Sequence, residues 1–136
     1  MKRTLTALTV AATMFASSAS AADPADLQKL KDTNECVKCD LEGAILGFAN
    51  LKGAYLTGAN LEGANLVSAF LVGAELGGAN LEGAHLEGAH LGDAFLGDAH
   101  LGAANLRGAF LEGAKMNGAT LCNTIMPDGS VIYSGC

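Results

Sequence analysis

The 136-residue chain contains no tryptophan, only 5% aromatic residues and only eight lysines and arginines. Without large aromatic side chains, a core must be built from small and uniform pieces, and the apolar half of the sequence is mostly alanine and leucine. Charged residues make up 16% of the chain against 50% hydrophobic residues, a balance that argues against intrinsic disorder. The length suits a single domain.

Basic residues are scarce, which restricts the possible partners. Fourteen acidic residues outnumber the eight basic ones, and the formal net charge is −6 at pH 7. Lys2 and Arg3 lie in a segment that we expect to be removed, and the six remaining basic residues then leave a net charge of −8. Nucleic acids and anionic membranes are captured by clustered lysine and arginine, so neither is an expected partner.

The N-terminus has the pattern of a secretory signal peptide. A basic start precedes a twelve-residue, mainly apolar run at residues 5–16, and small residues follow. The run is shorter than the roughly 20 residues that a membrane-spanning helix needs. Ala19-Ser20-Ala21 matches an A-x-A cleavage signal. Residues 1–21 are therefore predicted to be a cleaved signal peptide, and the mature protein to be periplasmic or secreted.

A five-residue repeat fills the middle of the chain, with seventeen consecutive units over residues 39–123. The first position is Ala in sixteen units, the third is Leu in sixteen, and the fifth is Gly in eleven. This period fits neither a 3.6-residue helix nor a two-residue strand. The pattern indicates a backbone that turns a corner in every unit, so that Ala and Leu point inward and Gly accepts the corner conformation.

These tandem Ala-(Asp/Asn)-Leu-x-x units, such as Ala59-Asn60-Leu61-Glu62-Gly63, resemble the pentapeptide-repeat family over 85 of the 136 residues. The resemblance implies an all-β fold, a right-handed quadrilateral parallel β-helix in which four units form one coil. Residues 20 apart then stack in columns, and second and fourth positions face solvent. Seventeen units make about four coils. A solenoid filled with Ala and Leu offers no obvious cleft, so no enzyme is expected.

The segment before the repeat is predicted to be a cap, because an open solenoid end exposes unpaired backbone. Asp23 followed by Pro24 is a helix N-cap signal with proline at the first helical position. A short helix is therefore expected over residues 24–32, lying over the first coil, within an N-terminal cap of residues 22–38.

The segment after the repeat is predicted to be a second cap. The Pro-Asp-Gly sequence at residues 127–129 is a turn signal. Residues 124–126 and 131–133 are therefore expected to form a hairpin within a C-terminal cap of residues 124–136.

All four cysteines lie in the mature chain, and an exported protein with an even number of cysteines favours disulfides. In the solenoid that the resemblance implies, Cys39 opens the first coil and Cys122 lies in the last unit, roughly 19 Å away. A disulfide needs Cα atoms within about 7 Å. The expected pairs are then Cys36–Cys39 and Cys122–Cys136. Thiol-redox or metal handling through the CxxC is a further alternative, which requires a reactive thiolate.

Three histidines, His85, His90 and His100, look like a metal cluster along the sequence, near Asp93 and Asp98. In a four-unit coil these histidines fall on three different faces. Metal ligands must converge at about 2.0–2.1 Å from the ion, and side chains on different faces diverge. No metal site, cofactor or catalytic set is therefore expected.

One column of the implied solenoid is acidic. It carries Asp40, Glu42, Glu62 and Glu82 at coil spacing. We interpret this acidic stripe as a solubilising surface. The alternative is a site for a cation or a basic partner.

A second column begins at Asn50 and continues every 20 residues with side chains that are aromatic and expected to be exposed. Contiguous apolar surface marks partner sites more often than scattered residues do. An aromatic ladder that stabilises coil stacking is the alternative. The candidate interaction face comprises Phe70, Val72, His90 and Phe110, with Tyr55 and Phe95 stacked on the neighbouring face and widening it.

The leading hypothesis is a non-enzymatic, exported structural or protein-interaction module, whose aromatic face contacts another protein or a second copy. The alternative comes from a branch of the family that resembles duplex DNA and binds DNA gyrase. The acidic composition fits that branch. The predicted signal peptide, the cysteines and the small number of coils do not, because the alternative requires a cytoplasmic location.

Intact-mass measurement of the native protein, alkylated without reductant, tests the export prediction. The expected chain begins at Ala22 and carries no alkyl group, because cleavage and oxidation both occur outside the cytoplasm. A chain that begins at Met1 and carries four alkyl groups would contradict this prediction and favour the gyrase alternative.

Overall fold

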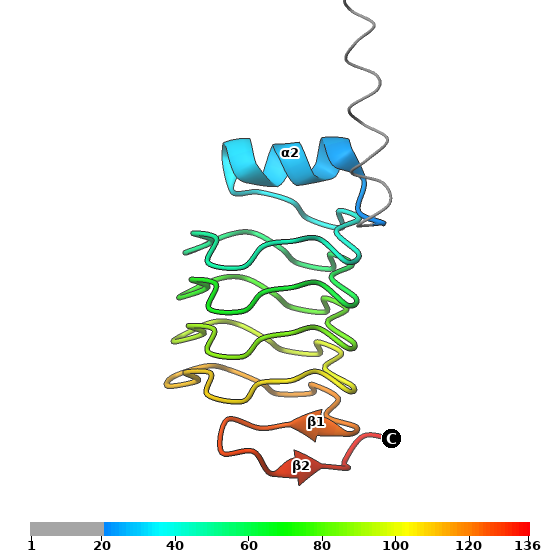
Figure 1. Cartoon of the computed structure of the whole chain (residues 1–136), viewed down its shortest axis with the longest axis vertical. Helices are drawn as coiled ribbons and strands as arrows, with labels where there is room; N and C mark the ends of the chain where they lie inside the picture. The colour runs from blue at the N-terminus through cyan, green and yellow to red at the C-terminus, as the bar shows by residue number, and fades with distance from the viewer. Residues whose placement is uncertain (1–20) are drawn as a thin grey trace, which may run out of the picture.

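The computed structural model describes residues 21–136 (Figure 1). The helix α2 spans Pro24–Thr33 at one end, and the strands β1 (Thr124–Ile125) and β2 (Val131–Ile132) lie at the other. Stacked coils fill the space between them. The predicted signal peptide lies outside the described residues, except for Ala21, and stays a prediction. Within residues 21–136, no helix is long and apolar enough to cross a membrane.

The coils stack with a constant register of 20 residues. Isolated parallel bridges join each second-position residue to its equivalent in the next coil, as in the column Asn60, Asn80 and His100. Four such columns start at Glu35, Asp40, Ile45 and Asn50. Four units therefore complete one coil, and the chain forms the expected right-handed quadrilateral parallel β-helix.

Backbone hydrogen bonds run along the stack and around each corner. Asn80 donates to the carbonyl of Ala59 at 2.9 Å, and its own carbonyl accepts from Leu61 at 2.7 Å. At the corner, the N–H of Ala64 donates to the carbonyl of Leu61 at 3.0 Å. Gly63 between them has φ +63°, which glycine adopts at low cost. This corner conformation explains the preference for glycine at the fifth position.

First and third positions point inward and fill the solenoid. In the inner coils, residues such as Leu61, Leu81 and Ala79 are fully buried. Burial of each leucine side chain contributes about 1.5–3 kcal/mol, so the leucine columns dominate the stability. In the last coil the inward residues are less buried: Leu111 and Met116 pack against the core but are only partly buried, because no further coil covers them.

The N-terminal helix ends the stack through specific hydrogen bonds. The Asp23 carboxylate accepts from the N–H of Ala25 at 2.8 Å, which satisfies a free donor of the helix start. The Asp26 carboxylate accepts from the N–H of Asp40 in the first coil at 2.8 Å, and Leu30 is buried. The helix extends one residue beyond the expected end and stops at Asn34, which has φ +63°.

The C-terminal hairpin closes one face of the last coil. Strands β1 and β2 pair antiparallel, as expected, and Ile125 of β1 also bridges to Asn105 in the coil above. Thr124 is buried and donates its hydroxyl to the carbonyl of Leu101 at 2.7 Å. The hairpin thereby joins the solenoid by main-chain and side-chain hydrogen bonds.

Each cap carries one disulfide, in the two expected pairings. Cys36 and Cys39 have Cα atoms 5.2 Å apart, and Cys122 and Cys136 have Cα atoms 4.9 Å apart. The second bridge closes a 15-residue loop, which contributes about 3 kcal/mol in the chain-entropy account of disulfides.

Truncation of an inner leucine tests the importance of the core columns. Leu76→Ala should lower the free energy of unfolding by about 2–5 kcal/mol, because a cavity remains in a filled interior. The adjacent Glu75→Ala, on the exposed surface, should change it by no more than about 0.5 kcal/mol. Guanidinium denaturation measures both, and equal losses would contradict this account of the core.

The hairpin turn offers a test by pH. The Ser130 hydroxyl and N–H both donate to the Asp128 carboxylate, at 2.6 and 2.9 Å, and these bonds lower the pKa of Asp128. Ser130→Ala should raise this pKa toward its ordinary value in an NMR titration. A carboxyl whose pKa is lowered on folding contributes stability above its unfolded pKa and loses it on acidification. The wild-type hairpin should therefore weaken more than the variant as the pH falls through this range.

Candidate interaction surface

Three aromatic rings stack along one face of the solenoid. The rings of Phe70 and His90 have centroids 4.9 Å apart and are inclined by 9°, and those of His90 and Phe110 are 4.9 Å apart and inclined by 14°. The 20-residue register places all three at second positions of one column. Aromatic pairs contribute about 0.5–1.5 kcal/mol beyond the area they bury, so this ladder also supports the stacking of coils.

The ladder remains open to solvent. Phe70 is 43% exposed and Phe110 is 57% exposed, although each ring already contacts His90. Val72, two residues after Phe70, is partly exposed. We call these four residues, Phe70, Val72, His90 and Phe110, the aromatic face. It is a strip of exposed aromatic and apolar side chains along one column of the solenoid.

A groove at the N-terminal end of the aromatic face was not predicted. Its volume is about 460 Å³, and it is lined by Phe48, Asn50, Lys52, Phe70 and Val72. The expectation that a filled solenoid has no cleft is therefore wrong for the surface, where side chains of neighbouring columns rise around a hollow. Phe48, the residue that sequence reasoning missed, occupies a fifth position where glycine is usual.

Tyr55 and Phe95 lie in the neighbouring column but do not stack on each other, because Glu75 lies between them. The Phe95 ring instead lies against the wall of the solenoid. A Cβ atom at Gly77 would be 3.0 Å from this ring, and one at Gly97 would be 2.8 Å from it. These glycines therefore make room for the Phe95 ring, which has a packing role of its own.

The acidic stripe is interleaved with amides. The side chain of Asn80 donates to Glu62 at 3.3 Å and to Asn60 at 3.4 Å. Asn80 also accepts from the N–H of Glu82 at 3.0 Å. Glu62 and Glu82 border a second hollow, of about 400 Å³, that extends toward Cys122 and Asn123. The bond from the Asn80 amide to Glu62 offsets part of the repulsion along the stripe, which supports a solvated surface.

The three histidines lie in three different columns. His90 belongs to the aromatic face, His100 follows Asn80, and His85 lies between Asn65 and Asn105. Within residues 21–136, no three or more histidine, cysteine or acidic side chains are grouped to hold a metal ion.

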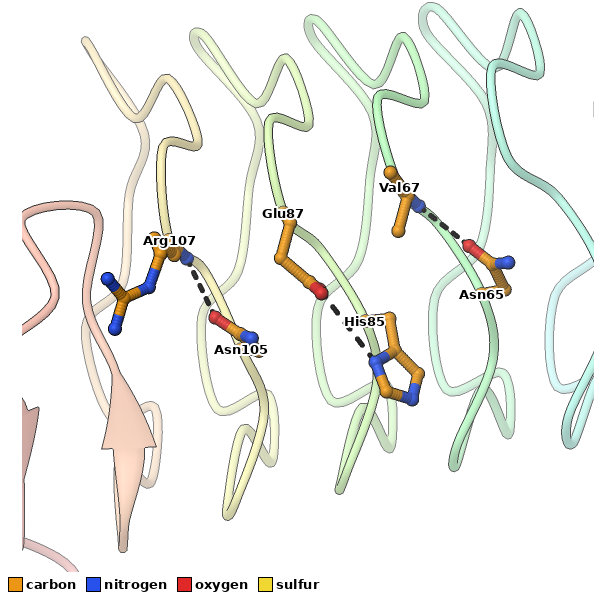
Figure 2. A network of polar contacts seen from close by, with 6 residues as sticks. All are labelled: Asn65, Val67, His85, Glu87, Asn105 and Arg107. Atoms are coloured by element: carbon orange, nitrogen blue, oxygen red, sulfur yellow. Dashed lines mark hydrogen bonds and ion pairs between the residues drawn. The ribbon is translucent and has the colours of Figure 1, made fainter.

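A repeated polar contact marks the His85 column (Figure 2). The side chains of Asn65 and Asn105 accept from the backbone N–H two residues later, each at 3.0 Å. The equivalent residue in the coil between them, His85, has its Nδ1 3.8 Å from the carboxylate of Glu87. Local turn contacts therefore account for the two asparagine side chains, whereas Oε2 of Glu87 is buried without a hydrogen bond in the described part of the chain and has only the longer contact with His85.

The CxxC pair is enclosed by the N-terminal cap. Cys36 is fully buried and Cys39 is 5% exposed. A reactive cysteine needs a partly exposed thiolate in an electropositive setting. The burial therefore argues against thiol-redox chemistry at this pair.

The comparisons with known proteins agree with this architecture. Residues 35–71 and 94–126, about half of the chain, match the family described as pentapeptide repeats, in eight copies. No curated protein matches the chain significantly.

Several solved structures are similar to the chain. A pentapeptide repeat protein from the Arabidopsis thaliana thylakoid lumen is 25% identical, with a TM-score of 0.53, over 73% of this chain and 70% of its own length. Another, from Nostoc PCC 7120, is 37% identical over 65% of this chain and 69% of its own length, with a TM-score of 0.44.

HetL is a pentapeptide repeat protein involved in heterocyst differentiation regulation in Nostoc sp. strain PCC 7120. It is 38% identical over 72% of this chain, with a TM-score of 0.39, and this chain spans about half (51%) of the length of HetL. The five-residue period, the four-column register and the family match together show that the chain belongs to the pentapeptide-repeat family.

Proposed function

We propose that this protein is an exported, non-enzymatic solenoid that works as a protein-interaction module through its aromatic face. The observation that carries the proposal is the stacked and exposed ladder of Phe70, His90 and Phe110. Aromatic residues dominate the energetics of protein interfaces. The partner is another protein chain, and a second copy of this chain is one such partner.

The distribution of polar groups supports a binding role over catalysis. The interior is filled by alanine and leucine, and histidines and carboxylates are spread over separate columns. Catalysis requires a nucleophile, a base and a stabilising group in mutual reach. The surface of this solenoid instead offers repetitive outward faces, one of which carries the exposed aromatic ladder, and these suit contact with another protein.

Two features support export. The N-terminal pattern is typical of a secretory signal peptide. Both caps are closed by disulfides, which persist in oxidising compartments. The similar Arabidopsis protein comes from the thylakoid lumen, so the family fold occurs outside the cytosol.

Replacing the two phenylalanines of the aromatic ladder tests the proposal. Phe70→Ser combined with Phe110→Ser should weaken self-association in sedimentation velocity or remove specific partners captured from the native compartment, because both apolar rings are lost. Tyr133→Ser is the matched control, since Tyr133 is 69% exposed in the C-terminal cap, away from the ladder.

Thermal unfolding of each variant shows whether the solenoid stays folded. If the folded double variant keeps both the self-association and the captured partners of the wild type, the aromatic face is not the interaction surface and the proposal is wrong.

A further inference from the structure

Phe48 occupies a position where its backbone and its side chain are both unfavourable for stability. Its φ is +60°, a left-handed conformation that is strained for a bulky residue. Its ring is 72% exposed, more than any other large hydrophobic residue that the structure describes. Eleven of the seventeen units have glycine at the equivalent corner position. Stability of the fold therefore does not explain this phenylalanine, and strained residues often mark functional sites.

The Phe48 ring forms one wall of the groove described above, which we call the Phe48 groove. Phe70 and Val72 from the next coil supply the rest of its apolar lining. The volume of about 460 Å³ lies in the range of small-molecule sites, which are usually apolar with a few polar groups that fix orientation. The rings of Phe48 and Phe70 and the side chain of Val72 suit the apolar or aromatic part of a small-molecule ligand.

The polar groups of the groove are hydrogen-bond donors. Lys52 is exposed, and its ammonium has no ion-pair partner within residues 21–136. The side-chain oxygen of Asn50 accepts from the N–H of Lys52 at 3.3 Å, and its amide nitrogen has no acceptor in the same part of the chain. An ammonium and an amide N–H₂ therefore border the apolar lining.

The local charge at the groove favours an anionic ligand. Lys52 supplies this positive charge, whereas the predicted mature net charge of −8 acts against anions only at long range, where salt screens it. The fourth-position residues that follow Lys52 in its column are Val72, Gly92 and Glu112, so the next charge in this row lies three coils away, about 14 Å. On its other side Lys52 meets the cap, where the Asn34 side chain donates to the Lys52 carbonyl at 2.9 Å. A small anion therefore meets no carboxylate of this row on the C-terminal side of Lys52 before Glu112.

We propose that the Phe48 groove binds a small organic carboxylate with an aromatic or aliphatic body. The body lies against the rings of Phe48 and Phe70, and the carboxylate pairs with the ammonium of Lys52 and the amide of Asn50. This inference does not rest on the proposed protein-interaction function.

An NMR titration of the mature, disulfide-intact protein tests the ligand class. Phenylacetate is the probe, with phenylacetamide as its neutral analogue and benzylamine as its cationic analogue. Phenylacetate should shift the amide signals of residues 48–53 and 70–73, and bind about two- to fivefold more tightly than phenylacetamide, the effect of one exposed ion pair. Equal binding of phenylacetate and benzylamine, or shifts confined to other residues, would overturn the proposal.

Two variants separate the charge from the ring. Lys52→Met should remove the preference for phenylacetate over phenylacetamide, whereas the matched control Lys115→Met, an exposed lysine on the neighbouring face, should keep it. Phe48→Gly should abolish the shifts and raise the Tm, because glycine relieves the strained corner.

The variants also distinguish failure of this proposal from failure of the proposed function. Phe48→Gly leaves all four residues of the aromatic face in place, so self-association measured by sedimentation should match the wild type. Unchanged phenylacetate binding by Phe48→Gly, together with a lower Tm, would assign the ring to packing and overturn the groove as a ligand site.

Discussion

The structure depends on one constraint, the left-handed backbone conformation required at every fifth residue. Each corner lets the next Ala and Leu point inward, and four corners close a coil. Residues 20 apart then meet, as the rings of Phe70 and His90 do. Where glycine is absent, as at Ser68, Asp93 and Asp98, φ still lies between +55° and +58°. The register therefore overrides the local preference of the corner residue, and main-chain bonds along the stack offset the strain.

This constraint divides the residues of each unit into two roles. First and third positions belong to the core, and their small variety reflects the narrow interior. Second and fourth positions point outward and vary more, within local limits such as the room that two fourth-position glycines leave for the Phe95 ring. The residues that contact a ligand or partner must therefore be those at the second and fourth positions and, in the case of Phe48, at the fifth position. Phe70 and Lys52 line the same groove although they are 18 residues apart in the sequence, because the 20-residue register stacks their units.

Much of the fold was predictable, since the strict period identifies the inward positions and the family resemblance implies four units per coil, from which the columns and faces follow. The Asp23 cap and the hairpin followed from local signals, whereas the two disulfide pairings followed from the length of the solenoid that the resemblance implies. The surface was less predictable. The period places Phe95 outward but does not show that its ring folds onto Gly77 and Gly97. It also treats Phe48 as one more corner, although a ring there projects beside the neighbouring face and forms a groove. Side-chain direction at corners depends on dihedral angles that a repeat pattern does not encode.

The partly covered final coil makes the two ends of the stack differ in stability. Each inner coil is held by neighbours on both sides, whereas Leu111, Met116 and Leu121 have one neighbouring coil and a hairpin that pairs with a single face. In a linear stack, stability is close to a sum over adjacent units, so loss of structure starts where neighbours are fewest. Unravelling should thus proceed from the C-terminal coil toward α2. The Cys122–Cys136 bridge ties the chain end to the last repeat at the point where this unravelling begins.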